Sequence, residues 1–310
     1  MSADGVWRFH SQDLSIRAAV AISTTAVQKI SEAHAALPIA RVAMGRLVSG
    51  AAVLAAHAGE GVVVGVRVQG DGPLGFLYAE ANHEGQVRAH CAVPQLDVAL
   101  PKTASEEDAR RLAEGNISIA AAVGSGTFSV TRSLPFETQP FVATVPIVSG
   151  EIGNDLAWYL QQSFQIPSIV SVGVVLGSDG RVTGAGAVLI ELMPGASEFT
   201  IRMLERNAEK APSLSRTVES GATPEEILRN YVGEMSMVRT SGEDRSLRFV
   251  CRCSAERVER ALLLLGAAEI SELIAKAEPV SAKCEFCNRN WTVNLERLGE
   301  LQASAKTSPR

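Results

Sequence analysis

The sequence of 310 residues predicts an α+β protein: a large mixed core domain of antiparallel strands with packed helices, followed by a helical linker and a small C-terminal domain. Three observations support this. Strand-like and helix-like stretches occur in blocks, which favours α+β over a doubly wound sheet. Hydrophobic residues make up 46% of the chain and charged residues 20%, enough to bury a sizeable core. Four of the five cysteines lie in two close pairs near the C-terminus.

The core begins with two helices. Apolar residues at helical spacing predict the first over residues 25–36, ending before Pro38. The second runs from about 39 to 56 and is so rich in alanine and glycine that we expect it to pack closely on several sides. Three β-branched stretches separated by turn residues between 61 and 93 predict an antiparallel meander. Later expected elements are strands at 117–123 and 127–133, a helix at 151–163 and a hairpin of strands 168–176 and 181–192.

After residue 196 the sequence becomes more charged and helix-compatible, with proline and glycine breaks. This predicts a linker of helical pieces that packs weakly on its own, although an ordinary helical connector would have the same pattern. In its methionine-containing stretch we expect the apolar side chains of Met235, Met237 and Val238 to contact bound proteins.

The cysteine pairs predict a metal site. Two short pairs, Cys251 with Cys253 and Cys284 with Cys287, can supply the four tetrahedral sulfur ligands that zinc prefers. On an extended strand over 247–253, both thiols of the first pair would face one side. Three further elements are expected after this strand. They are a helix capped by Ser254, a second short helix, and a hairpin of 280–286 and 291–295 with the second pair in its turn. So small a unit should depend on metal for its fold, and both a permanent zinc staple and a redox switch remain open.

Composition limits the other functions. A net charge of −5 gives no general reason to bind nucleic acid or anionic membrane. The N-terminus lacks a secretory signal, and the longest apolar run, 47–58, is too short to span a bilayer. Few, paired cysteines indicate reduced thiols, so we expect a cytoplasmic protein.

Two other classes of protein are alternatives. A zinc ribbon that binds nucleic acid would need clustered arginines, but those near the cysteines alternate with glutamates. A thiol oxidoreductase would place Cys284 and Cys287 at the start of a helix rather than in a hairpin turn, and we expect no enzyme. Cys91 shares an apolar strand face and is expected to be a buried structural cysteine.

The stretch Phe249–Leu262, with Cys284–Asn288, closely resembles the zinc-binding end of the redox-regulated heat shock protein 33 family, the 33 kDa chaperonins. Stretches of the core are similar to the family's motifs in the same order. They are Gln69–Gly75, Pro146–Ile152, Gln165–Ser168 and Leu192–Ala196. Two residues depart from the family's pattern: Phe164 stands where it usually has Glu, and Ala187 where it usually has Gly.

The resemblance implies a stress-response, ATP-independent molecular chaperone of the holdase type, with a core domain at 1–196, a redox-sensitive linker at 197–248 and a zinc domain at 249–310. The reduced form would hold one Zn²⁺ per chain and be inactive. Oxidation would release zinc, form disulfides within each cysteine pair and unfold the linker. The active form, often a homodimer, would then bind unfolding client proteins and prevent their aggregation. The ligands implied are Cys251, Cys253, Cys284 and Cys287, and the disulfides implied are Cys251–Cys253 and Cys284–Cys287.

Overall fold

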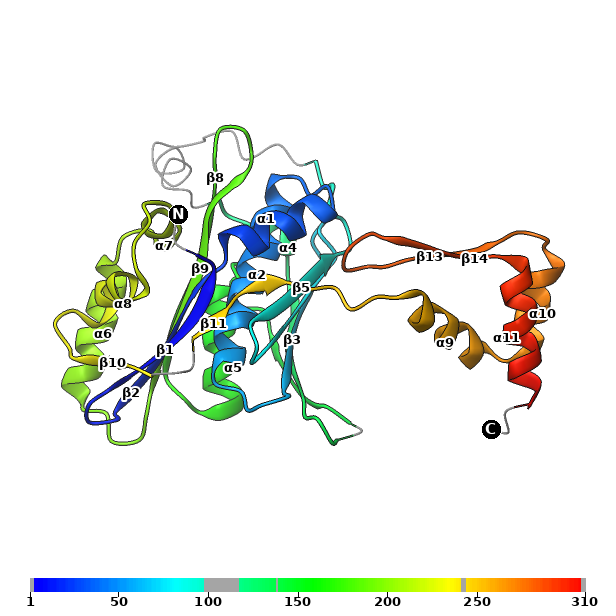
Figure 1. Ribbon diagram of the computed structural model, residues 1–310. Helices are drawn as coiled ribbons and strands as arrows, with labels where there is room; N and C mark the ends of the chain where they lie inside the picture. Colours follow the sequence, from blue (N-terminus) through cyan, green and yellow to red (C-terminus); the bar gives the residue numbers. More distant parts are fainter. Residues whose placement is uncertain (1–2, 98–116, 138, 241–243, 308–310) are drawn as a thin grey trace. The chain divides into compact units, whose positions relative to one another are not determined.

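A computed structural model of the chain describes residues 3–97, 117–137, 139–240 and 244–307 (Figure 1). It has the expected α+β composition of antiparallel sheets and helices. Its contacts divide it into two compact units, 1–250 and 251–310, which are described separately below.

The first sheet of the larger unit, sheet A, has the strand order β10-β1-β2-β9-β8, and β11 pairs with β1 beside β10. All of its described pairings are antiparallel. The hairpin of β8 and β9 was predicted, whereas β1 and β2 were not. The strands are β1 (Gly5–Ser11), β2 (Ile16–Ile22), β8 (Ser168–Leu176), β9 (Val182–Leu192), β10 (Met237–Arg239) and β11 (Arg245–Ser246).

The second sheet, sheet B, has the order β12-β5-β4-β3-β6-β7. The meander of β3, β4 and β5 is antiparallel, as predicted, and only β12 joins the described part of this sheet in parallel. Strand β7 was not predicted. The strands are β3 (Val63–Gly70), β4 (Phe76–Asn82), β5 (Gln86–Cys91), β6 (Gly126–Ser133), β7 (Phe141–Pro146) and β12 (Arg248–Phe249).

One predicted strand is wrong. Residues 117–123 were expected to be extended, but the segment forms the single-turn helix α4 (Ala120–Val123). Its consecutive alanines favour a helical turn. The carbonyls of Ala122 and Val123 then accept hydrogen bonds from Leu74 and Gly72 in the turn before β4, each at 3.0 Å.

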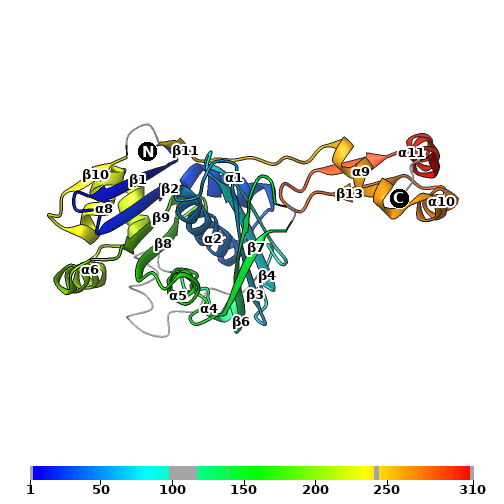
Figure 2. The ribbon, with the colours of Figure 1, turned by 90° about the horizontal axis from the view of Figure 1, so that it is seen from below.

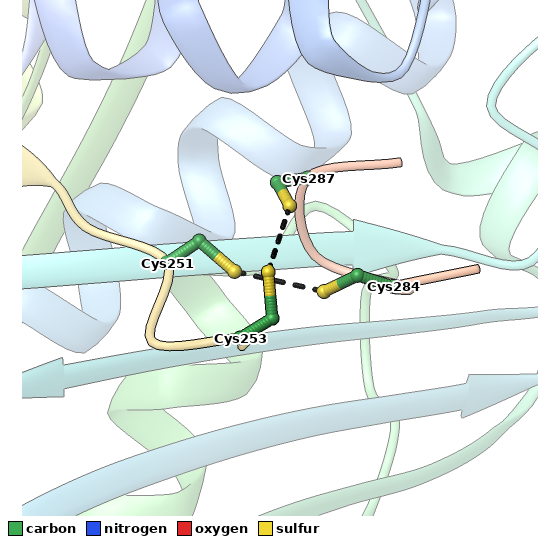
Figure 3. Close-up of side chains that lie close together, drawn as sticks. All are labelled: Cys251, Cys253, Cys284 and Cys287. Carbon is green, nitrogen blue, oxygen red and sulfur yellow. Dashed lines mark hydrogen bonds between the residues drawn. The ribbon is translucent and has the colours of Figure 1, made fainter. Parts of the chain in front are cut away.

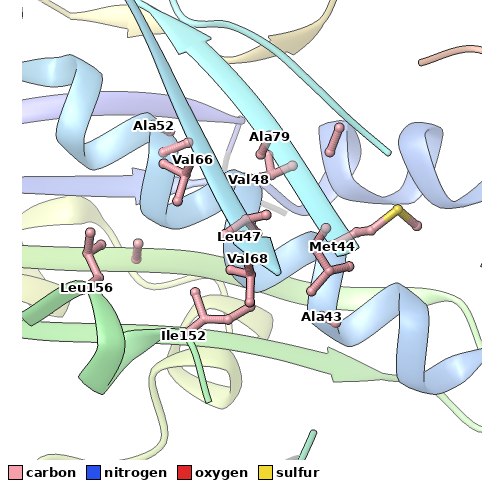
Figure 4. Packing of buried hydrophobic residues seen from close by; sticks show 14 of the residues in the cluster. Ala43, Met44, Leu47, Val48, Ala52, Val66, Val68, Ala79, Ile152 and Leu156 are labelled. Carbon is pink, nitrogen blue, oxygen red and sulfur yellow. The ribbon is translucent and has the colours of Figure 1, made fainter. Parts of the chain in front are cut away.

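Helix α2 (Pro38–Ala56) lies between the two sheets (Figure 2) and forms the centre of the core. Figure 4 shows its side chains packed among Val66, Val68 and Ala79 of sheet B, and the same cluster includes residues of sheet A. The helix is long and apolar enough to cross a membrane by length and composition, yet 89% of its most apolar window is buried inside the protein. Its all-round apolar surface is therefore explained by packing, as its alanine and glycine content predicted.

Helices α1 (Thr24–Ala33) and α5 (Gly153–Phe164) complete the core. Both match predicted helices. Both residues that depart from the family's pattern pack in the core, Phe164 at the end of α5 and Ala187 in β9. The Phe164 ring packs edge-on against Tyr159, with a centroid distance of 5.8 Å, and stacks under Arg132. Ala187 is fully buried in β9.

The predicted helical linker is folded as three helices, α6 (Glu198–Lys210), α7 (Leu214–Glu219) and α8 (Pro224–Val232). They cover the face of sheet A opposite α2. Their buried apolar side chains join those of the sheet in one cluster, which we call the linker–sheet cluster. It includes Leu204, Val218, Ile227 and Leu228 from the helices and Phe9, Ile16, Val20, Val188 and Ile190 from the sheet. The sheet thus supplies the core that the linker lacks by itself.

A histidine with buried ring nitrogens lies at the end of α2. His57 is 3.6 Å from the carboxylate of Glu191, which Arg17 already holds in a bidentate pair at 2.6 and 2.9 Å. Because that carboxylate is already neutralised by Arg17, burial dominates, and together with the nearby charges of Arg17 and Arg8 it lowers the pKa of His57 to about 3. His57 is therefore neutral near pH 7.

The smaller unit contains helices α9 (Ala255–Leu265), α10 (Ala267–Ala275) and α11 (Leu295–Thr307), and a hairpin of β13 (Val280–Lys283) and β14 (Asn290–Val293). The first two helices and the hairpin match the prediction, but α11 was not predicted. Five apolar side chains among its described residues are buried. They are Leu262, Ile270, Val293, Leu298 and Leu301.

Candidate metal centre

Four thiols of the smaller unit point toward one another (Figure 3). Cys251 and Cys253 lie in the extended segment before α9, and Cys284 and Cys287 lie in the turn between β13 and β14. The predicted strand over 247–253 is wrong in part, since its β-ladder ends at Phe249 and both cysteines follow it. Their thiols nevertheless face the same point, as expected.

Local hydrogen bonds position each pair. Ser254 caps α9, because its hydroxyl accepts a hydrogen bond from the N–H of Arg257 at 3.3 Å, and this helix start fixes the segment just after Cys253. The second pair is held by its turn. The N–H of Cys284 donates to the carbonyl of Arg289 at 2.9 Å, and the N–H of Asn288 donates back to the carbonyl of Cys284 at 2.8 Å.

The sulfur positions match a tetrahedral site. The Sγ atoms of Cys251 and Cys284 are 3.6 Å apart, those of Cys253 and Cys287 are 3.5 Å apart, and all four lie within 4.8 Å of one another. Four sulfurs each about 2.3 Å from a zinc ion would be about 3.8 Å apart. A disulfide would need about 2.05 Å, so these are free thiols in a cage that fits a metal ion.

Different surroundings give the thiols different acidities. Burial raises the pKa of Cys251 to about 12 and raises that of Cys287. At Cys253 burial also raises the pKa, but the Trp291 side chain and the other three thiols outweigh it and lower the value to about 7. Metal binding, which requires thiolates, must therefore release protons from this cluster.

Four cysteine ligands would close the coordination sphere. A catalytic zinc site keeps one position for water or substrate, whereas a site with four thiolates has none. The arrangement therefore suits a metal that holds the fold together. Because thiolates are also the species that oxidants attack, the same arrangement suits a metal site that oxidation can disrupt.

The other singled-out residues lie in the larger unit. Met235 and Met237 are half-buried against the linker–sheet cluster, while Val238 is 40% exposed on β10. Cys91 is buried, as expected, and burial raises its pKa to about 11.

Sequence reasoning missed two contributors to the smaller unit. Trp291, on β14, lies beside Cys253 and was taken only as a strand residue. Helix α11 supplies Leu298 and Leu301 to the core, although leucines three residues apart after Asn294 were a readable signal. The side chain of Asn294 accepts the N–H of Arg297 at 2.9 Å and starts the helix.

Comparisons with known proteins agree over nearly the whole chain. A family model described as Hsp33 protein matches residues 4–294. The 33 kDa chaperonin of Bacillus subtilis is 35% identical over 291 residues, covering 94% of this chain and 95% of that protein. The 33 kDa chaperonin of Desulforamulus reducens is 34% identical over 298 residues, covering 96% and 97%. The crystal structure of the heat shock protein 33 homologue of Thermotoga maritima superposes with a TM-score of 0.87 at 28% identity, covering 99% of this chain and 100% of that one.

Proposed function

The chain belongs to the Hsp33 family of chaperones, and on this premise we propose that it is an ATP-independent holdase switched on by oxidation of a four-cysteine zinc site. One observation carries the proposal: four thiols from two distant segments meet within 4.8 Å in a unit that has little core of its own. The ligands are Cys251, Cys253, Cys284 and Cys287. Zinc, once bound, supplies the cross-link that keeps this unit folded.

The switching step balances with peroxide as oxidant. For each disulfide formed, two thiolates give two electrons to one hydrogen peroxide molecule, which takes up two protons and leaves as two waters. Two peroxides therefore convert four thiolates into two disulfides, and the zinc ion, left without ligands, departs. The fold of the smaller unit is expected to leave with it.

The disulfides proposed are Cys251–Cys253 and Cys284–Cys287. In the reduced fold, each sulfur lies near a partner from the other pair, so distance alone does not select these disulfides. Once the unit unfolds, however, the entropy of loop closure favours partners two or three residues apart over partners more than thirty residues apart. Mass spectrometry of the peroxide-treated chain tests this. Disulfides that join a cysteine of the first pair to one of the second would contradict the proposal, in which the unit unfolds before the second bond forms.

Activation would act through the linker at 197–248. Strand β12 ends at Phe249, two residues before Cys251, so distortion at the first cysteine pair is adjacent in sequence to the linker's last strand. Release of α6–α8 would uncover the apolar face of sheet A. We propose this face, with Met235, Met237 and Val238, as the client-binding surface. We further propose that the protein acts in the cytoplasm, that its active form is a homodimer, and that it has no catalytic turnover.

The experiment follows three quantities together during peroxide treatment: free zinc by a chromogenic chelator, free thiols, and suppression of aggregation of a heat-unfolding client by light scattering. We expect four thiols and one zinc ion to be lost as suppression appears, and sedimentation to show a dimer. The Cys91→Ser variant is the control, because its thiol is outside the cluster and should leave the switch intact. Zinc and thiols lost with no gain in suppression would contradict the proposal.

A further inference from the structure

Helix α7 is the shortest of the three linker helices, and it lies directly on strands β8 and β9 of sheet A. It buries only two apolar side chains, Leu214 and Val218, in the linker–sheet cluster. The main contacts of α6, in contrast, are with α8. A helix of six residues is not stable by itself in water, so α7 depends on its fit to the strands beneath it.

Glycines of sheet A make room for this fit. Gly173 on β8 and Gly184 and Gly186 on β9 face the linker, since atoms of α7 are among the nearest to the empty Cβ position of each. A Cβ atom added to Gly184 would be 2.3 Å from the carbonyl oxygen of Ser215 and 2.9 Å from the nitrogen of Glu219. One added to Gly173 would be 3.0 Å from the nitrogen of Ser215. The backbone of α7 therefore lies on the backbone of the sheet at these positions.

The conformation of the strands does not require glycine at these three positions. None of the three residues has a positive φ angle, so alanine could adopt the same strand geometry. The distance of 2.3 Å at Gly184, however, is well below the roughly 3.5 Å at which non-bonded heavy atoms attract each other best. The lack of a side chain at residue 184 therefore serves the docking of α7, not the strand itself.

Polar groups fix the position of α7 above these glycines. The hydroxyl of Thr183, the residue before Gly184 on β9, donates a hydrogen bond to the carboxylate of Glu219 at 2.5 Å. Arg216 donates to the other oxygen of this carboxylate at 2.6 Å. At the beginning of the helix, Ser215 is buried with only 1% exposure. Both ends of α7 are thus held against the strand pair.

We propose that Gly173, Gly184 and Gly186 form a fitted seat for α7, and that α7 in this seat is the contact that keeps the reduced chain inactive. This deepens the proposed chaperone function and rests on it. Close contact between backbones is lost over a short distance, because a gap of about 0.5–1 Å removes roughly a quarter to a half of the attraction. A small displacement therefore releases α7 completely and opens the linker–sheet cluster, to which Leu214 and Val218 belong.

The Gly184→Ala variant tests the seat in the full-length, reduced, zinc-loaded chain with no oxidant added. We expect hydrogen exchange in α7 to be at least tenfold faster than in the unmodified chain, and exchange in α2 to be unchanged. The variant should suppress client aggregation at least half as well as the oxidised unmodified chain, while it keeps its zinc and its free thiols. Ala185→Gly is the matched control. It removes a methyl group from the next residue, which is buried on the opposite face of the sheet, and it should stay inactive until oxidised.

Faster exchange in α7 without aggregation suppression by the reduced Gly184→Ala chain would overturn the proposal, because α7 would then leave without activating the protein. Unchanged exchange in α7 would overturn it as well, and so would equal activity of reduced Ala185→Gly, which would point to general weakening of sheet A.

The Thr183→Val variant is a second test that adds no bulk, since it removes only the hydroxyl that donates to Glu219. It should be activated at no more than half the peroxide concentration that the unmodified chain needs, and an equal requirement would contradict the role of α7. If the oxidised, unmodified chain itself fails to suppress aggregation, the proposed function fails instead, whereas hydrogen exchange in α7 still reports on the seat.

Discussion

Removing zinc from the reduced chain should unfold residues 251–310 and leave residues 1–250 folded. A unit of 60 residues has a net stability of about 3–9 kcal/mol at typical values per residue. A structural zinc bound by thiolates supplies about 10–16 kcal/mol. With five buried apolar side chains among its described residues, the smaller unit has no reserve that could replace this contribution.

Hydrogen exchange resolved by mass spectrometry checks this prediction. After addition of a strong zinc chelator under reducing conditions, amides in α9, α10 and α11 should exchange at the rates of an unfolded chain, while those in α2 and β9 stay protected. The Cys287→Ser variant should behave in the same way without chelator. Cys91→Ser, which alters a thiol of the other unit, should keep the smaller unit protected. Slow exchange in α10 and α11 after complete zinc removal would contradict this prediction.

Three further substitutions give measurable outcomes. His57 is neutral when folded down to about pH 3 but takes up a proton in the unfolded chain below about pH 6.5, so stability is full above pH 6.5 and falls by up to about 1.4 kcal/mol per pH unit on acidification. In His57→Gln, urea unfolding between pH 6.5 and 4.5 should show a shallower decline, and an equal slope would contradict the assignment. Thr223→Ala removes the hydroxyl that caps α8 and should lower the stability of this helix by about 1 kcal/mol. We expect roughly fivefold faster hydrogen exchange in α8 and activation at a lower peroxide concentration. Unchanged exchange would show that the cap does not limit the stability of the helix. Leu298→Ala removes a fully buried side chain at a cost of about 2–5 kcal/mol. Because folding and metal binding are coupled in this unit, zinc affinity should fall at least thirtyfold in a competition titration, and an unaltered affinity would mean that the metal-free unit is folded.

Local patterns predicted the elements in which the burial of residues differs between the two faces or between the two ends. In the meander of β3–β5 the middle strand, β4, alternates buried and half-buried residues, and the turns carry glycine, so the antiparallel type was readable. Strand β2 was missed because α2 packs on one of its faces and the linker helices on the other, so almost every residue is buried and no alternation remains. The strand predicted over residues 117–123 was wrong for a related reason, since a short apolar run fits a strand and a helical turn equally well.

Short spacing and ligand type were enough to predict that the four thiols of two close pairs would come together at distances that suit a metal ion, without knowledge of the rest of the fold. The composition of α2 likewise predicted that this helix packs closely on several sides, because it leaves no polar face. The packing of the linker helices onto sheet A and the order of the strands in the two sheets were readable only from the fold. Strand order and register join residues far apart in the chain, and local residue patterns carry no information about which distant segment becomes the neighbour.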